Sequence, residues 1–172
     1  MKKFFGIIFA WVLMSSICFA NINAEYLTSM AIGGVQIGSN EEYVRSIYGK
    51  PDRIEYNKYA DGTNKQGSTI YTYIYGGTFN ILFCGNNRIP MQVGEIISTA
   101  NNGITTEAGL SVGDTESKIT ELYGTENLKT YHKKDGVIQY VYTIGKGFGR
   151  AFTVYVKHGE VIKIELNSSY NV

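Results

Sequence analysis

Most of the chain after residue 50 alternates apolar and polar side chains with a period of two. This is the pattern of strands in a half-buried sheet. It predicts eight strands, at Arg53–Lys58, Thr69–Tyr75, Thr78–Cys84, Gln92–Thr99, Leu128–Lys133, Val137–Ile144, Arg150–Lys157 and Glu160–Asn167. The pairs Gly76-Gly77, Asp135-Gly136 and His158-Gly159 are typical of tight hairpin turns. Neighbouring strands are therefore expected to run antiparallel.

Two short segments, 39–48 and 114–123, have a helical period instead. Each places apolar residues three and four positions apart, at Val44, Ile47 and Tyr48 and at Ile119, Leu122 and Tyr123. Ser39 and Asp114 are N-cap types, and Ser39 with Glu42 forms an S-x-x-E capping box. Gly49 and Gly124 fall at the position after each helix, where a positive φ is favoured.

These two segments belong to an internal duplication. Residues 34–49 align with residues 109–124 at a constant offset of 75, with five of 16 positions identical and four more exchanging one aliphatic residue for another. The interpretation is an α+β fold of two tandem repeats, residues 33–105 and 106–172. Each repeat would be a short helix packed on an antiparallel sheet of about four strands, and residues 25–32 would be an N-terminal linker.

Residues 1–24 have the layout of a signal peptide. Lys2 and Lys3 precede an uncharged, largely apolar run over residues 4–20, and small residues follow, so cleavage is expected after Ala20 or Ala24. The protein would then be exported to the periplasm or cell envelope of a bacterium, or secreted. The run is at the short end for a transmembrane anchor. Lipidation of Cys18 is disfavoured because the preceding residue is a bulky isoleucine.

Composition narrows the classes of partner. The full chain holds 16 Lys and Arg against 15 Asp and Glu, and removal of the signal peptide leaves 14 basic residues. The chain has no excess of positive charge that would bind nucleic acid. It would contact the membrane only through an uncleaved signal segment. Cys84 would be the only thiol of the mature chain, which excludes an intramolecular disulfide and favours a buried thiol.

No catalytic motif is found. Gly145, Gly147 and Gly149 are misspaced for a dinucleotide-binding loop and are better interpreted as a long turn. His132 and His158 lack further ligands for a metal site. Glu41 and Glu116 recur in the first turn of each predicted helix, where the helix dipole explains them. The sequence therefore predicts a non-enzymatic protein with no cofactor and no metal.

The remaining functional signal is aromatic. Fourteen tyrosines stand beside one tryptophan, and several alternate along strands. Phe79, Ile81, Phe83, Phe152, Val154 and Val156 are assigned to the helix-covered core. The opposite face would then carry the predicted protein-binding residues, Tyr71, Tyr73, Tyr75, Tyr140 and Tyr142, since tyrosine suits protein recognition. The alternative is that some of these tyrosines pack beneath the helix.

The repeated Gly-aliphatic-x-aliphatic-Gly, helix, Tyr-Gly pattern, followed by four strands, resembles the SmpA/OmlA (BamE-like) envelope lipoproteins. Two such units in tandem resemble the architecture of the β-lactamase inhibitory proteins. The disulfides of the inhibitory proteins and the lipidated cysteine of the lipoproteins are not reproduced in this chain. The resemblance implies a protein-binding module, inhibitor-like or an envelope assembly factor. A small-ligand carrier or hydrolase with a site built from scattered residues is the alternative.

Overall fold

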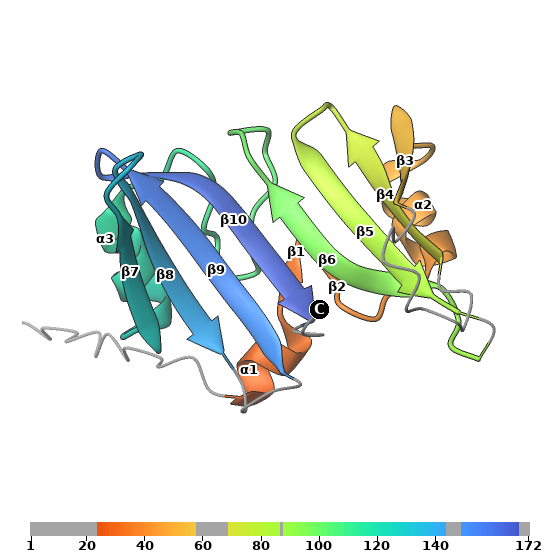
Figure 1. Ribbon diagram of the computed structural model, residues 1–172, viewed down its shortest axis with the longest axis horizontal. Coiled ribbons are helices and arrows are strands. Elements are labelled where there is room, and N and C mark those ends of the chain that lie inside the picture. Colours follow the sequence, from red (N-terminus) through yellow and green to blue (C-terminus); the bar gives the residue numbers. More distant parts are fainter. Residues whose placement is uncertain (1–23, 58–68, 87, 144–148, 169–172) are drawn as a thin grey trace, which may run out of the picture.

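The computed structural model describes residues 24–57, 69–86, 88–143 and 149–168. Its main element is one eight-stranded antiparallel sheet with the strand order β3-β4-β5-β6-β10-β9-β8-β7 (Figure 1). The strands are β3 (Arg53–Asn57), β4 (Thr69–Tyr75), β5 (Phe79–Gly85), β6 (Gln92–Ser98), β7 (Leu128–His132), β8 (Val137–Thr143), β9 (Arg150–Lys157) and β10 (Glu160–Ser168). All eight predicted strands are present, and no end differs from the prediction by more than one residue.

The sheet is continuous because β6 pairs with β10. Four pairs of opposed residues make this joint, from Glu95 opposite Asn167 to Ser98 opposite Ile164. Strands β3–β6 lie on one side of the joint and β7–β10 on the other. The two sets of strands therefore form one wide sheet.

Both predicted helices form, as α2 (Glu41–Tyr48) and α3 (Glu116–Tyr123). They cover the same face of the sheet near its two ends, and Figure 1 views the opposite face. Tyr48 of α2 packs on Phe79 at 5.1 Å between ring centroids, and Tyr123 of α3 packs on Phe152 at 4.9 Å. The apolar stripe of α2 is narrower than predicted, because Val44 is fully buried whereas Ile47 is 43% exposed.

The N-caps of both helices lie one residue later than predicted. Asn40 is the N-cap of α2, and its Oδ1 accepts a hydrogen bond from the Tyr43 amide at 2.7 Å. The α3 N-cap is Thr115, whose side chain makes no capping hydrogen bond. Ser39 and Asp114 instead accept hydrogen bonds from the backbone N–H three residues before them. Both side chains therefore stabilise the turn that precedes the helix rather than the helix itself.

Equivalent backbone hydrogen bonds recur in the two halves of the chain. The Gly38 amide donates to the Val93 carbonyl on β6, and the Gly113 amide donates to Val161 on β10, both at 2.8 Å. The amides of Val93 and Val161 donate in return to Ser39 and Asp114, again at 2.8 Å. Each helix is thus held to the strand that lies next to the joint.

The expected linker over residues 25–32 is instead part of the core. It forms α1 (Ala24–Ser29) and β1 (Ala31–Ile32), which pairs with β2 (Val35–Gln36). Leu27 and Met30 are 1% and 0% exposed. The elements are too short to show a period in the sequence, and their burial comes from contacts with distant strands. Residues 1–23 of the expected signal peptide, which spans residues 1–24, lie outside the described residues.

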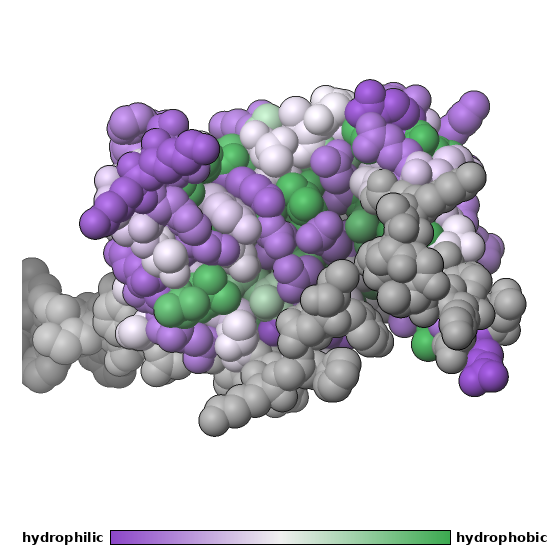
Figure 2. All heavy atoms as spheres, in the orientation of Figure 1, coloured by the Kyte–Doolittle hydropathy of each residue, from purple (hydrophilic) through white to green (hydrophobic). Residues whose placement is uncertain are grey.

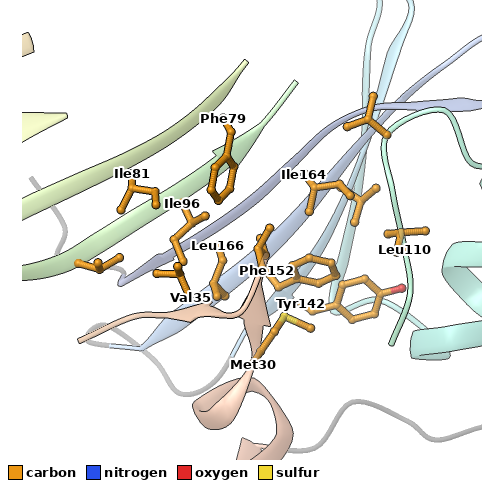
Figure 3. Close-up of a cluster of buried hydrophobic side chains, with 14 of the residues drawn as sticks. Met30, Val35, Phe79, Ile81, Ile96, Leu110, Tyr142, Phe152, Ile164 and Leu166 are labelled. Carbon is orange, nitrogen blue, oxygen red and sulfur yellow. The ribbon is translucent and has the colours of Figure 1, made fainter. Parts of the chain in front are cut away.

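The core fills the space between the sheet and these segments. Figure 3 shows Met30 and Val35 beneath Ile96, Leu166 and Phe152, where the two halves of the sheet meet. The Arg150 guanidinium reaches from β9 to the Thr28 carbonyl and to the Ile37 carbonyl at 3.3 Å. The N-terminal segment is therefore fixed on the helix side of the sheet, across the joint.

Candidate functional site

The structure places the predicted protein-binding tyrosines on the helix-covered face, so their expected exposure on the open face is wrong. Tyr71, Tyr73, Tyr140 and Tyr142 are between 1% and 9% exposed, and Tyr75 is half-buried. Directly opposed residues of neighbouring strands share a face of the sheet. Since Tyr73 opposes Ile81 and Tyr142 opposes Phe152, the tyrosines lie on the same face as the correctly assigned core.

The hydroxyl groups of the buried tyrosines donate hydrogen bonds to the glutamate at the start of each helix. Tyr71 donates to the Glu41 carboxylate at 2.7 Å, and Tyr73 donates to the other oxygen. Arg45 lies over the Tyr73 ring and donates to Glu41 at 2.9 Å. The hydrogen bonds from Tyr73 and then Tyr71 hold the pKa of Glu41 below its ordinary 4.5.

The second half repeats this arrangement with a different cation. Tyr140 donates to Glu116, and Lys129 from β7 donates to the Tyr140 hydroxyl and lies 3.5 Å from Glu116. Glu41 and Glu116 therefore do more than complement the helix dipole: they receive the tyrosine hydroxyls beneath each helix. Sequence reasoning missed this role because it assigned the tyrosines to the other face.

The open face of the sheet is the remaining candidate for a functional surface. Helices α1, α2 and α3 all pack on the other side, and the part of the chain that the structure describes places no helix over this face. One row of directly opposed residues crosses all eight strands: Arg53, Ile74, Asn80, Ile97, Glu165, Thr153, Val141 and Leu128. Figure 2 shows hydrophobic and hydrophilic residues interspersed on this side.

A polar cluster occupies the middle of the open face, around the joint of β6 and β10. Glu165 accepts hydrogen bonds from Tyr155 at 3.0 Å and from the Asn167 amide at 2.9 Å. The Lys163 Nζ lies 2.6 Å from the Glu165 Oε2. The same nitrogen lies over the Tyr155 ring, 4.5 Å from the ring centroid. This network orders four side chains on two strands, so the centre of the face is a defined polar surface.

The predicted free thiol also lies on the open face. Cys84 on β5 is half-buried rather than fully buried, and burial raises the pKa of its thiol. Its Sγ fills the space beside Gly94, where a Cβ would come within 2.8 Å. Gly94 stands at a bulge of β6, so the missing side chain leaves room for the thiol.

The described residues contain no group of three or more side chains that could hold a metal ion. His132 is exposed on β7 and contacts Gln139 at 3.1 Å, while His158 forms part of the β9–β10 turn with a φ of 55°. Within the same residues, no helix is long and apolar enough to cross a membrane. Of the predicted glycine-rich turn at 145–149, only Gly149 is among the described residues.

The burial of the tyrosines predicts a stability effect. Tyr142→Ala should lower the free energy of unfolding by about 3–5 kcal/mol, because it removes a fully buried ring and leaves a cavity. Tyr131→Ala is the matched control, since Tyr131 is 60% exposed and should change stability by less than about 0.5 kcal/mol. Urea denaturation followed by circular dichroism measures both. Equal stability of the two variants would contradict the observed placement.

The lowered pKa of Glu41 predicts a pH-dependent contribution to stability. Glu41→Gln should cost about 1 kcal/mol at pH 7, near the low end for a charged hydrogen bond, since 36% of the side chain is exposed and water screens it. The folded pKa lies below the ordinary 4.5, so the contribution is complete above that value and is lost as the pH falls through the folded pKa.

Urea midpoints of the wild type and of Glu41→Gln should therefore stay apart above pH 4.5 and converge as the pH is lowered below it. Glu42→Gln is the control, because Glu42 lies beside Glu41 in the first turn of α2 but is exposed and makes no hydrogen bond with its side chain among the described residues. A gap that does not shrink as the pH is lowered through the acid range in which the protein stays folded would contradict the assigned role of the tyrosine hydrogen bonds.

Comparison with known proteins shows only faint likeness. No protein-family model and no curated protein sequence matches the chain. Among solved structures, it is similar to a DUF4309 family protein, YjgB, from Bacillus subtilis, at 16% identity and a TM-score of 0.41, over 76% of this chain and 79% of that one. It is also similar to a Streptococcus mutans protein provisionally described as a beta-lactamase inhibitor, at 15% identity and a TM-score of 0.28, over 74% and 82%. At these scores neither likeness carries an argument about function.

Proposed function

We propose that this protein is an exported, non-catalytic module that binds another protein on the open face of its sheet. The observation that carries the proposal is the asymmetry of the sheet. Three helices and the N-terminal segment cover one face, whereas the other face presents side chains from all eight strands with no helix over it among the described residues. An uncovered sheet of this width is a broad surface of the kind that suits a protein partner rather than a small molecule.

The composition of the open face supports this role. The face carries apolar side chains, such as Leu82, Ile97 and Val141, as well as the ordered polar cluster around Glu165. Protein interfaces combine apolar contact area with hydrogen-bonding groups in this way. The tyrosines first assigned to binding lie behind the face, where they stiffen the strands that present it.

The chemistry of the described residues favours binding over catalysis. Cys84 is the only thiol among the described residues, and its raised pKa disfavours the thiolate that a nucleophile requires. No hydrogen bond among the described residues joins it to His132 or His158. The protein would therefore act by binding to its partner, as an inhibitor or an envelope assembly factor does.

The proposed location outside the cytoplasm rests on the sequence of residues 1–24. A charged start, an apolar run and small residues at its end are the features of a cleaved signal peptide. Cleavage after Ala20 would leave α1 whole, whereas cleavage after Ala24 would remove its first residue. The mass of the exported chain distinguishes the two, and an intact Met1 would contradict the proposal.

We further propose that residues 33–105 and 106–172 are two copies of one structural unit. The recurrence of equivalent backbone hydrogen bonds at Gly38 and Gly113, which are 75 residues apart, supports this, as does the matching Tyr–Glu contact beneath each helix. The copies would share one sheet through β6 and β10. An experimental structure in which the copies failed to superpose would contradict the duplication.

The binding proposal is tested by blocking the open face without disturbing the core. Ala151 lies on this face, opposite Asn167 on β10 and Thr143 on β8. The substitution Ala151→Arg adds a long side chain that projects from the sheet, so it should abolish capture of a partner from envelope extracts and culture supernatant while changing the thermal midpoint little.

Thr120→Arg on the exposed surface of α3 is the matched control and should leave capture intact. Quantitative mass spectrometry of proteins retained by the immobilised wild type and the two variants provides the measurement. A set of retained proteins that Ala151→Arg leaves unchanged would show that the open face is not the binding surface.

A further inference from the structure

Glu95 places a carboxyl group at the centre of the open face. It lies midway along β6, opposite Leu82 on β5 and Asn167 on β10. Its side chain is half-buried. Among the residues that the structure describes, no hydrogen bond or ion pair reaches its carboxylate, although the neighbouring Glu165 has several.

The charges around Glu95 do not balance. The cluster holds two carboxylates, Glu95 and Glu165, and one ammonium group, on Lys163. That ammonium is engaged by Glu165 at 2.6 Å and by the Tyr155 ring. Burial raises the pKa of Glu95, and the negative charge of Glu165 raises it further, while Lys163 only partly opposes them. Among the described residues, the cluster therefore has one carboxylate, Glu95, with no cation of its own.

Two amide oxygens beside Glu95 also lack donors. The Asn167 amide nitrogen donates to Glu165, a contact that fixes the other end of the group as the acceptor Oδ1. That oxygen is buried and has no hydrogen-bond partner among the described residues. The Asn80 Oδ1, on the neighbouring strand β5, is in the same state. A buried acceptor left unpaired costs free energy, and an incoming donor could recover it after a small movement of the side chain exposes the oxygen.

We propose that the partner presents an arginine side chain that docks on Glu95, with its guanidinium also donating to the Asn167 oxygen. This inference rests on the proposed function and adds the chemistry of the contact. An arginine offers five N–H donors in a planar fork, so one group can meet a carboxylate and a nearby amide oxygen together, which a lysine does less well. Leu82 and Ile97 flank Glu95 and provide an apolar surface for the aliphatic stem.

The test uses a small probe, so it does not depend on finding the partner. N-acetyl-arginine amide is titrated into the ¹⁵N-labelled protein at millimolar concentration and followed by amide chemical shifts. Saturable shifts are expected at the centre of β6 and β10, around Glu95 and Asn167. The citrulline analogue has the same shape without the charge and should cause no saturable shift there. Equal shifts from the citrulline analogue, or shifts only elsewhere, would overturn the proposal.

Glu95→Gln provides the second arm and should weaken binding of the arginine probe at least tenfold. Glu55→Gln is the matched control, because Glu55 lies at the edge of the same face and is already paired with Arg53 at 2.7 Å. Binding by Glu95→Gln as tight as that of the wild type would overturn the proposal.

A stability measurement separates a docking role from a structural one. Since Glu95 has no partner within the described residues, Glu95→Gln should keep or raise the thermal midpoint at pH 7. A lowered midpoint, or failure of the variant to fold, would show that the carboxylate serves the fold and would also overturn the proposal. If Ala151→Arg fails to block capture while the arginine probe binds through Glu95, the proposed function fails and the cation site stands. The reverse result rejects the cation site alone.

Discussion

The pairing of β6 with β10 is the contact on which the rest of the structure depends. Without its four residue pairs the molecule would be two four-stranded sheets. The strands β6 and β10, which are now interior strands, would then be edge strands exposed to water. An unpaired edge presents N–H and C=O groups that pair readily with other chains, so the joint removes an aggregation hazard from both halves at once. It also makes the open face continuous and brings Glu95 and Glu165 onto neighbouring strands. The N-terminal segment and Arg150 pack behind the same joint, which keeps its two strands in register.

The sequence predicts the elements well and their faces less well. All eight strands of the main sheet and helices α2 and α3 can be located because periods of two and 3.6 are local properties of the chain. The face on which a strand places its side chains is a relation between strands. Tyr73 and Ile81 each alternate correctly within β4 and β5, but only the register of the hairpin shows that they share a face. Recognising Tyr–Glu pairing beneath the helix would have corrected the assignment, since Glu41 and Glu116 recur together with the tyrosines.

The residues that sequence reasoning missed are those whose role depends on distant contacts. Leu27 and Met30 lie in a segment too short to show periodicity, and their burial comes from strands more than a hundred residues away. Glu95 and Asn167 are ordinary polar residues on alternating strands, and their proximity exists only because β6 and β10 are neighbours in space. The candidate site thus forms only because the topology brings these strands together, and no local sequence motif predicts it.

The topology also sets an order on folding. The two strands of the joint are about 70 residues apart in the chain, and β10 follows all the other described elements. Hairpins within each half close short loops, whereas the joint must close a long one, a step that is entropically costly and slow. During synthesis the first half can assemble before the partner strand of β6 has been made. The nascent chain therefore passes through a stage in which an open strand edge needs protection, and that stage ends only when β10 pairs with β6.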